Sequence, residues 1–214
     1  MNLVVINILS NASCFSFALP LAAGVFYIKR LDGPMRLLVL LMIAVGITEV
    51  SSFFLIEFLK TQYYWIHHLY SPIEYTLFAL IFSRWINHRL YSKLVIYSIP
   101  AFIILSISNT LFLQGLNQLN SYTITLMFII YTIITLYVLH QIMADDIGNI
   151  LKNHIFWVST GLLIFSTGDL AYFAFHPLVE EHYLVVIWAI HTIFNMTTYI
   201  FYFVGIICQG KNWE

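Results

Sequence analysis

Residues 65–82, WIHHLYSPIEYTLFALIF, decide how the rest of the chain is interpreted. The stretch is long and apolar enough to cross a bilayer as one helix. It also carries His67, Ser71 and Glu74 at positions i, i+4 and i+7, so on a helix these side chains share one face. A carboxyl group well inside an apolar span is costly and by default indicates function. The stretch therefore predicts a transmembrane helix with a functional polar face.

The composition of the whole chain agrees with this interpretation. Of its 214 residues, 61% are hydrophobic and only 9% are charged, whereas a soluble domain carries about 25% charged residues. The net charge is -1 and no basic patch is present, so no nucleic-acid partner is expected. We expect the lipid bilayer as the main partner. The protein is predicted to be integral to the membrane, which is the cytoplasmic membrane if the source is bacterial.

Runs of about 20 mostly apolar residues predict an all-α membrane protein with seven transmembrane helices. Pro20 lies inside the first run, and Asn11 and Ser13 make its first half less apolar, so its outer end is expected to be frayed or kinked. Gly161 and Gly168 in the sixth run predict close helix contact. The connections are short, so residues 1–214 are predicted to form a single integral membrane domain. The seven predicted helices cover residues 4–27, 35–55, 65–86, 94–112, 123–143, 155–175 and 183–208.

The basic residues predict the orientation of the chain. Of the nine Lys and Arg residues, only Lys60 falls on one side of the predicted spans. Because cytoplasmic loops are enriched in Lys and Arg, this distribution places the N-terminus outside and the C-terminus in the cytoplasm. The residues on the cytoplasmic side are Lys29, Arg30, Arg36, Arg84, Arg89, Lys93, Lys152 and Lys211.

Two parts of the chain match each other in their polar positions. ITEVSSFF around Glu49 aligns with STGDLAYF around Asp169. The spans that follow align as well, His67-x3-Ser71-x2-Glu74-Tyr75 with His191-x3-Asn195-x2-Thr198-Tyr199. These matches indicate a 3+1+3 parallel repeat, with units 1–88 and 121–210 and a linker helix at 94–112. The alternative is a chance match between apolar helices, which is common.

The predicted topology gathers the intramembrane ionisable groups between the outer surface and the midplane, without any Lys or Arg. Three carboxyl groups in a low-dielectric bundle cannot all be ionised. They are therefore neutral, share protons with histidines, or hold a cation. The alternative is that they only join helices through hydrogen bonds. The predicted ligand- or ion-binding residues are Glu49, His67, Ser71, Glu74, Asp169, His191 and Asn195.

Three membrane families resemble the chain at these positions, one of them, the lysoplasmalogenases, only through Thr167-Gly168-Asp169-Leu170. The 3+1+3 repeat is similar to the SWEET and PQ-loop transporters, although the Pro-Gln dipeptides are missing. Glu49 and Asp169, together with Pro72-Ile73-Glu74, resemble the Pro-x-Glu-Glu motifs of the small carotenoid (lycopene) cyclases, with Tyr75 in place of the second acid. Zinc-dependent membrane hydrolases of the ceramidase type use a His-x3-His pair, which His191-x3-Asn195 breaks, so no metal site is assigned. No cofactor is assigned either.

These observations lead to three functional hypotheses. The first is a bundle with an outer-half acid and histidine site that binds or moves a small cation, a proton or a polar ligand. The second is a membrane sensor or partner-binding module that works with a separate cytoplasmic protein or as a homo-oligomer. The third is an intramembrane enzyme acting on a lipid or isoprenoid, with Glu74 or Asp169 as proton donor, as the cyclase resemblance implies.

Overall fold

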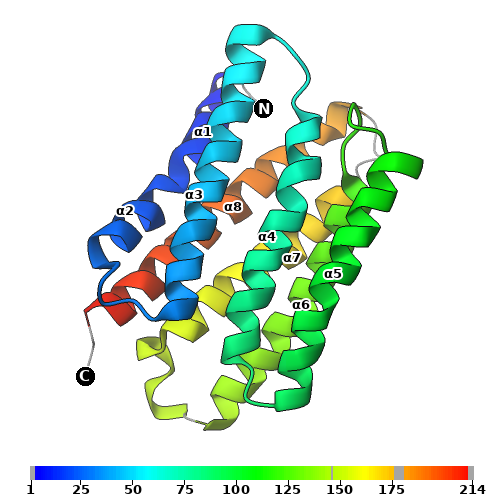
Figure 1. The fold of residues 1–214 in the computed structure, drawn as a ribbon. Coiled ribbons are helices and arrows are strands. Elements are labelled where there is room, and N and C mark those ends of the chain that lie inside the picture. The colour runs from blue at the N-terminus through cyan, green and yellow to red at the C-terminus, as the bar shows by residue number, and fades with distance from the viewer. Residues whose placement is uncertain (1–2, 146, 176–180, 212–214) are drawn as a thin grey trace. The chain divides into compact units, whose positions relative to one another are not determined.

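The computed structural model describes residues 3–145, 147–175 and 181–211, and within these ranges it is helical without a strand (Figure 1). A helix stands at each of the seven predicted positions, and α1 and α2 together form the first. The helices are α1 (Leu3–Ser16), α2 (Ala18–Tyr27), α3 (Gly33–Phe54), α4 (Tyr64–Trp85), α5 (Arg89–Phe112), α6 (Ser121–Asp145), α7 (His154–Phe175) and α8 (Glu181–Gly210), with a π-helical turn η1 (Leu55–Leu59) and a 3-10 turn η2 (Ile147–Lys152).

Among the described residues, four helices are long and apolar enough to cross a membrane. They cover Gly33–Leu59, Arg89–Phe112, Ser121–Ala144 and Val186–Gly210. The helix α4 is not one of the four, because His67, His68 and Glu74 lower its hydropathy. The chain thus has helices of the kind found in membrane proteins, while the crossing of the bilayer by α1 with α2, by α4 and by α7 stays a prediction.

Large apolar side chains are exposed along these helices. Ile47 of α3 is 65% exposed, and Ile104 and Leu111 of α5 are 64% and 68% exposed. In water, such apolar surface promotes association, but it is the surface that a bilayer core solvates. The exposed apolar faces therefore agree with the membrane assignment.

The first predicted span is interrupted at Phe17, between α1 and α2. Pro20 has no N–H group to donate to the carbonyl of Ser16, which removes one bond of the helical ladder at this point. The helix resumes with the bond from the Leu21 N–H to the Phe17 carbonyl, 3.1 Å long. The span is thus interrupted at Phe17, which keeps right-handed helical dihedral angles, φ -59° and ψ -23°.

The chain divides into two compact units. Unit 1 comprises residues 1–32 and 128–214, and unit 2 comprises residues 33–127. In unit 1, α8 packs on α7, α2 and α1. The core of unit 1 includes Val138, Val158, Leu162 and Ile206, all 0% exposed. The boundaries of these units differ from those of the proposed repeats, which stay a hypothesis.

In unit 2, α4 packs between α3 and α5, and the three helices run side by side (Figure 1). The buried ring of Tyr75 stacks on Phe102, with ring centroids 4.0 Å apart, and its hydroxyl bonds to Ser98. The α3 helix continues past its predicted end as η1 and stops at Lys60, whose φ of 51° is left-handed. The polar residues of α4 thus lie on a firmly packed helix.

Candidate functional site

Asp169 on α7 and His191 on α8 are in direct contact. Nδ1 of His191 lies 2.7 Å from Oδ1 of Asp169, which is a short hydrogen bond. The two helices approach closely because Gly168 lies against the ring of Phe194 and Gly161 lies against Phe201 and the Thr198 carbonyl. A side chain at either glycine would separate the helices. The close contact that the sequence predicts at Gly161 and Gly168 is confirmed.

The two partners of the pair differ in exposure. The side chain of Asp169 is 0% exposed and that of His191 is 25% exposed. Tyr172 stacks on the imidazole at a centroid distance of 5.4 Å, and Phe173 meets it edge-on at 6.3 Å. The pair therefore connects a partly accessible imidazole to a fully enclosed carboxyl group, with aromatic rings around the imidazole.

The contact between Asp169 and His191 permits three proton arrangements. In the first, a neutral imidazole donates its Nδ1–H to the carboxylate. With one more proton, either a protonated imidazole donates to the carboxylate or a neutral carboxylic acid donates to the imidazole nitrogen, and a proton moving along one short bond interconverts these two forms. The other oxygen of Asp169, Oδ2, is buried and makes no hydrogen bond with the described residues. Buried polar atoms nearly always have a partner, so this oxygen is available to a proton or a donor group.

Asn195 lies one helical turn after His191 on α8. Its Nδ2 donates to Oγ of Ser13, 3.0 Å away on α1, and both side chains are buried. The bond joins α8 to α1 beside the imidazole-bearing turn. Asn195 therefore acts in unit 1 as a residue that fixes the position of α8.

In unit 2, Glu49 of α3 and His67 of α4 are both near Tyr63. The rings of Tyr63 and His67 are 5.7 Å apart and meet edge-on. Burial raises the pKa of the Tyr63 hydroxyl above its usual value, and the neighbouring Tyr64 and Glu49 raise it further. The half-buried Glu49 and His67 thus share one neighbourhood, with Tyr63 as their common neighbour.

Ser71 and Glu74 are the deeper polar residues of α4, exposed by 2% and 8%. The hydroxyl of Ser71 donates to the carbonyl of His67 at 2.6 Å and accepts from Nδ2 of Asn120 at 3.3 Å. Asn120 in turn accepts from Asn109, 2.8 Å away on α5. Ser71 is therefore part of a buried amide network that joins α4 to α5 and to the segment before α6.

The seven residues predicted to form one site fall into both units. Asp169, His191 and Asn195 belong to unit 1, and Glu49, His67, Ser71 and Glu74 belong to unit 2. The structure brings Asp169 and His191 into direct contact, and it places the ring of His67 against that of Tyr63, whose pKa is raised in part by Glu49. That all seven residues share a single site stays a prediction.

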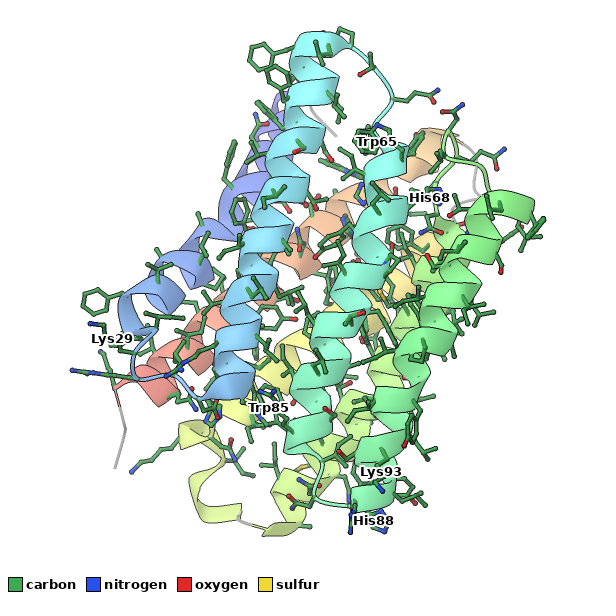
Figure 2. The ribbon with its side chains drawn as sticks, in the orientation of Figure 1. Lys29, Trp65, His68, Trp85, His88 and Lys93 are labelled. Atoms are coloured by element: carbon green, nitrogen blue, oxygen red, sulfur yellow. The ribbon has the colours of Figure 1, made fainter. Side chains whose placement is uncertain are left out.

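Several polar partners are not evident from the sequence pattern. One of them, Ser13, is far along the chain from its partner Asn195. The other two are in connecting segments, Asn120 before α6 and Tyr63 before α4. His68 lies on another side of α4 from His67 and is also held by polar partners. It is 4% exposed, with Nδ1 2.8 Å from the Thr110 hydroxyl and Nε2 3.1 Å from the Gln118 carbonyl. Figure 2 shows it near the Trp65 end of α4.

The described part of the chain contains no group of three or more His, Cys, Asp or Glu side chains placed to hold a metal ion. Comparison with protein-family models, curated proteins and solved structures finds no match to this chain. Any assignment of function therefore depends on the chemistry of the two acid and histidine groups.

Proposed function

We propose that this protein is an integral membrane protein that binds a proton at the Asp169–His191 pair and moves it within the bilayer. The observation that carries this proposal is the 2.7 Å contact between a partly accessible imidazole and a fully buried carboxyl group. In the form with a neutral imidazole and a carboxylate, a proton arrives on Nε2 of His191 and the Nδ1 proton crosses the short bond to Oδ1 of Asp169. Rotation of the carboxyl group then carries that proton to the position of Oδ2, from which it continues.

The proposal selects the proton from the ligands that the sequence permits. A hard cation such as Ca²⁺ takes six to eight oxygen ligands, whereas Asp169 offers one unbonded oxygen and His191 offers nitrogen. A proton needs only one acceptor with a neighbouring donor. Imidazole is also the side chain whose ordinary titration lies nearest neutral pH. The pair is therefore suited to taking up and releasing a proton under physiological conditions.

We also propose the topology with seven spans, an external N-terminus and a cytoplasmic C-terminus. In unit 2, Figure 2 shows Trp65 and Trp85 near opposite ends of α4, with His88 and Lys93 beyond the Trp85 end. At 1.5 Å per residue the two tryptophans are about 30 Å apart along the axis, which matches the hydrocarbon core. The basic end is then the cytoplasmic one.

Impermeant maleimide labelling tests this topology in a Cys14→Ser/Cys208→Ser background. Lys60→Cys should be labelled on intact cells, because Lys60 is exposed and on the predicted outer side. Lys29→Cys should be labelled only after permeabilisation. The reverse pattern would contradict the orientation, and labelling of both on intact cells would contradict the number of spans between them.

The hydrogen bonds of the two units support the proposed repeat. Ser71 and Asn195 occupy equivalent positions in the alignment, and each takes part in a serine–asparagine bond. Ser71 bonds to Asn120 just before α6, and Asn195 bonds to Ser13 on α1. In the proposed repeat, α1 and α6 are the equivalent first helices. The same pair of residue types bonds in both cases, with serine and asparagine exchanged, and Ser13 lies within α1 whereas Asn120 lies one residue before α6.

Proton flux in liposomes tests the proposed function. The purified protein is reconstituted with a pH-sensitive dye inside, and a potassium diffusion potential drives protons across the bilayer. Asp169→Asn keeps the size of the side chain but removes its ability to ionise, so flux should fall by about 100-fold. Glu57→Gln is the matched control, because Glu57 is a 53% exposed surface acid paired with Lys60.

Two results would overturn the proposal. One is wild-type protein whose flux equals that of empty liposomes, which would favour the sensor or enzyme hypotheses. The other is an Asp169→Asn variant that conducts like the Glu57→Gln control. Size-exclusion profiles and helical circular dichroism establish that each variant is folded before its flux is compared.

A further inference from the structure

One face of α7 carries a line of enclosed polar side chains. Ser159, Ser166 and Asp169 are each 0% exposed. At 100° per residue they lie within about 80° of one another around the helix. Residues 155–168 contain no charged side chain. The hydroxyl groups of Ser159 and Ser166 are therefore the polar groups on this face on the N-terminal side of Asp169.

The line of hydroxyl groups is extended by α6. Oγ1 of Thr132 is 3.1 Å from Oγ of Ser166, and its one hydrogen is shared between Ser166 and the Phe128 carbonyl, 2.8 Å away. Ser166 itself donates to the Leu163 carbonyl at 3.3 Å. Thr135, one turn further on α6, is 0% exposed. A hydroxyl group both accepts and donates, so Ser166 with Thr132 forms a relay element three residues from Asp169.

Two atoms on this face have unused hydrogen-bonding capacity. Oγ of Ser159 and Oδ2 of Asp169 are buried, and neither makes a hydrogen bond within the described residues. Enclosed polar atoms in proteins are satisfied by protein groups or by buried water. Both ends of the polar face are therefore places where a proton or a water molecule finds an open acceptor.

A second acid and histidine pair stands at the other end of α7. Nε2 of His154 is 3.7 Å from Oδ2 of Asp32 and 3.3 Å from Nε2 of Gln209. The Asp32 N–H bonds to Oε1 of Gln209, which fixes the amide so that its NH2 group points to His154. That NH2 group only donates, so Nε2 of His154 is the acceptor and carries a lone pair. A proton arriving there would exchange this bond for an ion pair with Asp32.

We infer that unit 1 contains a proton path along α7, from the Asp169–His191 pair through Ser166 and Thr132 to Ser159 and the Asp32–His154 pair. The inference rests on the proposed function and adds its route and its exit. The two pairs are 15 residues apart on α7, about 22 Å along the axis, which spans most of a hydrocarbon core. Water molecules complete the path between Ser166 and Ser159, which are two helical turns apart, about 10 Å.

Each step of this path conserves atoms and charge. A hydroxyl oxygen or a water molecule accepts the incoming proton and releases its own proton to the next acceptor. Asp169 returns to its starting form when the rotated carboxyl group gives up the proton and turns back. His154 takes up a proton on Nε2 and releases the proton of Nδ1 to the solution from its partly exposed ring. No oxidant, reductant or other co-reactant is needed.

The test is the flux of Ser159→Ala/Ser166→Ala in the liposome assay. Removing two relay hydroxyl groups should lower flux by about tenfold. Thr167→Ala is the matched control, because Thr167 is on the same helix, is exposed, and bonds only to the carbonyls of Leu163 and Ile164. Infrared spectroscopy of the Asp169 carboxyl group should show the same titration in both variants, since the pair itself is intact.

The result separates the path from the proposed function. If Asp169→Asn loses flux while Ser159→Ala/Ser166→Ala conducts like Thr167→Ala, the path is wrong and the proton pair stands. If Asp169→Asn conducts normally, both fail. His154→Gln provides a second check, because its site is partly exposed and tolerant. The substitution should lower flux by about tenfold. Normal flux in this variant would contradict the assignment of His154 as the residue that releases the proton.

Discussion

Unit 1 and unit 2 hold the same kinds of residue in different arrangements. In unit 1, the acid and the histidine touch, and the acid is fully enclosed. In unit 2, Glu49 and His67 are half-buried around Tyr63, and the deeply buried acid is Glu74, further along α4. The comparison indicates that matching residue types along the chain need not give matching chemistry. A direct contact depends on how closely two helices approach, and α7 and α8 have the glycines for it.

The largest expected difference between the units is in proton flux. Asp169→Asn should reduce flux by about 100-fold, and Glu74→Gln should reduce it less, because the structure gives Asp169 a histidine contact and an open oxygen on one carboxyl group. Dye-reported flux in liposomes measures both variants. Equal losses of flux in the two variants would contradict the difference between the units, since unit 2 would then contribute as much to proton flux as unit 1.

The next effect concerns the packing that permits the contact. A Cβ atom at Gly161 would lie 2.8 Å from Cβ of Phe201, whereas a Cβ atom at Gly115 in unit 2 would meet nothing within 4 Å. Gly161→Ala should therefore lower the free energy of unfolding by about 2 kcal/mol, and Gly115→Ala should leave it nearly unchanged. Thermal unfolding in detergent measures this. A similar melting temperature for both variants would show that α7 and α8 are less tightly packed than described.

A smaller effect is expected for the serine–asparagine bond of unit 1. Asn195→Ser and Ser13→Asn each disrupt a buried bond and should lower the free energy of unfolding by about 1–3 kcal/mol. The double variant restores the two residue types with their positions exchanged, as in unit 2. Its coupling energy should recover about 1 kcal/mol. Strict additivity of the two substitutions in a denaturation series would remove this support for the repeat.

The smallest effect is electrostatic and concerns unit 2. Burial, Tyr64 and Glu49 all raise the pKa of Tyr63, so the folded protein keeps this proton at a pH where the unfolded chain has begun to lose it. Stability contributed by Tyr63 is therefore present below the usual tyrosine pKa and is lost as pH rises above it. Glu49→Gln should lower the pKa of Tyr63. Ultraviolet titration measures the change, and the Tyr63→Phe variant identifies the signal of this tyrosine. An unchanged titration curve in Glu49→Gln would show that Glu49 does not influence the pKa of Tyr63.

The sequence predicts the helices well because hydropathy is a local property. Predicted residues 94–112 lie within α5, and residues 123–143 lie within α6. The predicted site residues Asp169 and His191 were both identified by their cost in an apolar span, and they prove to be partners. The partners of Asn195 and Ser71 could not be predicted in this way. Ser13 and Asn120 are ordinary polar residues near helix ends, and only the packing of distant helices brings them into contact.

The continuity of α8 has a mechanical consequence. The helix carries His191 about a third of the way along it and Gln209 near its C-terminal end, about 27 Å apart along one axis. It is held by the Asn195–Ser13 bond and, at its end, by Arg30 on the Gly210 carbonyl and by Tyr27 against Gly210. A rigid rod transmits an axial displacement without loss. Any sliding of α8 would therefore change two contacts at the same time, that of His191 with Asp169 and that of Gln209 with His154. The two contacts would form and break together.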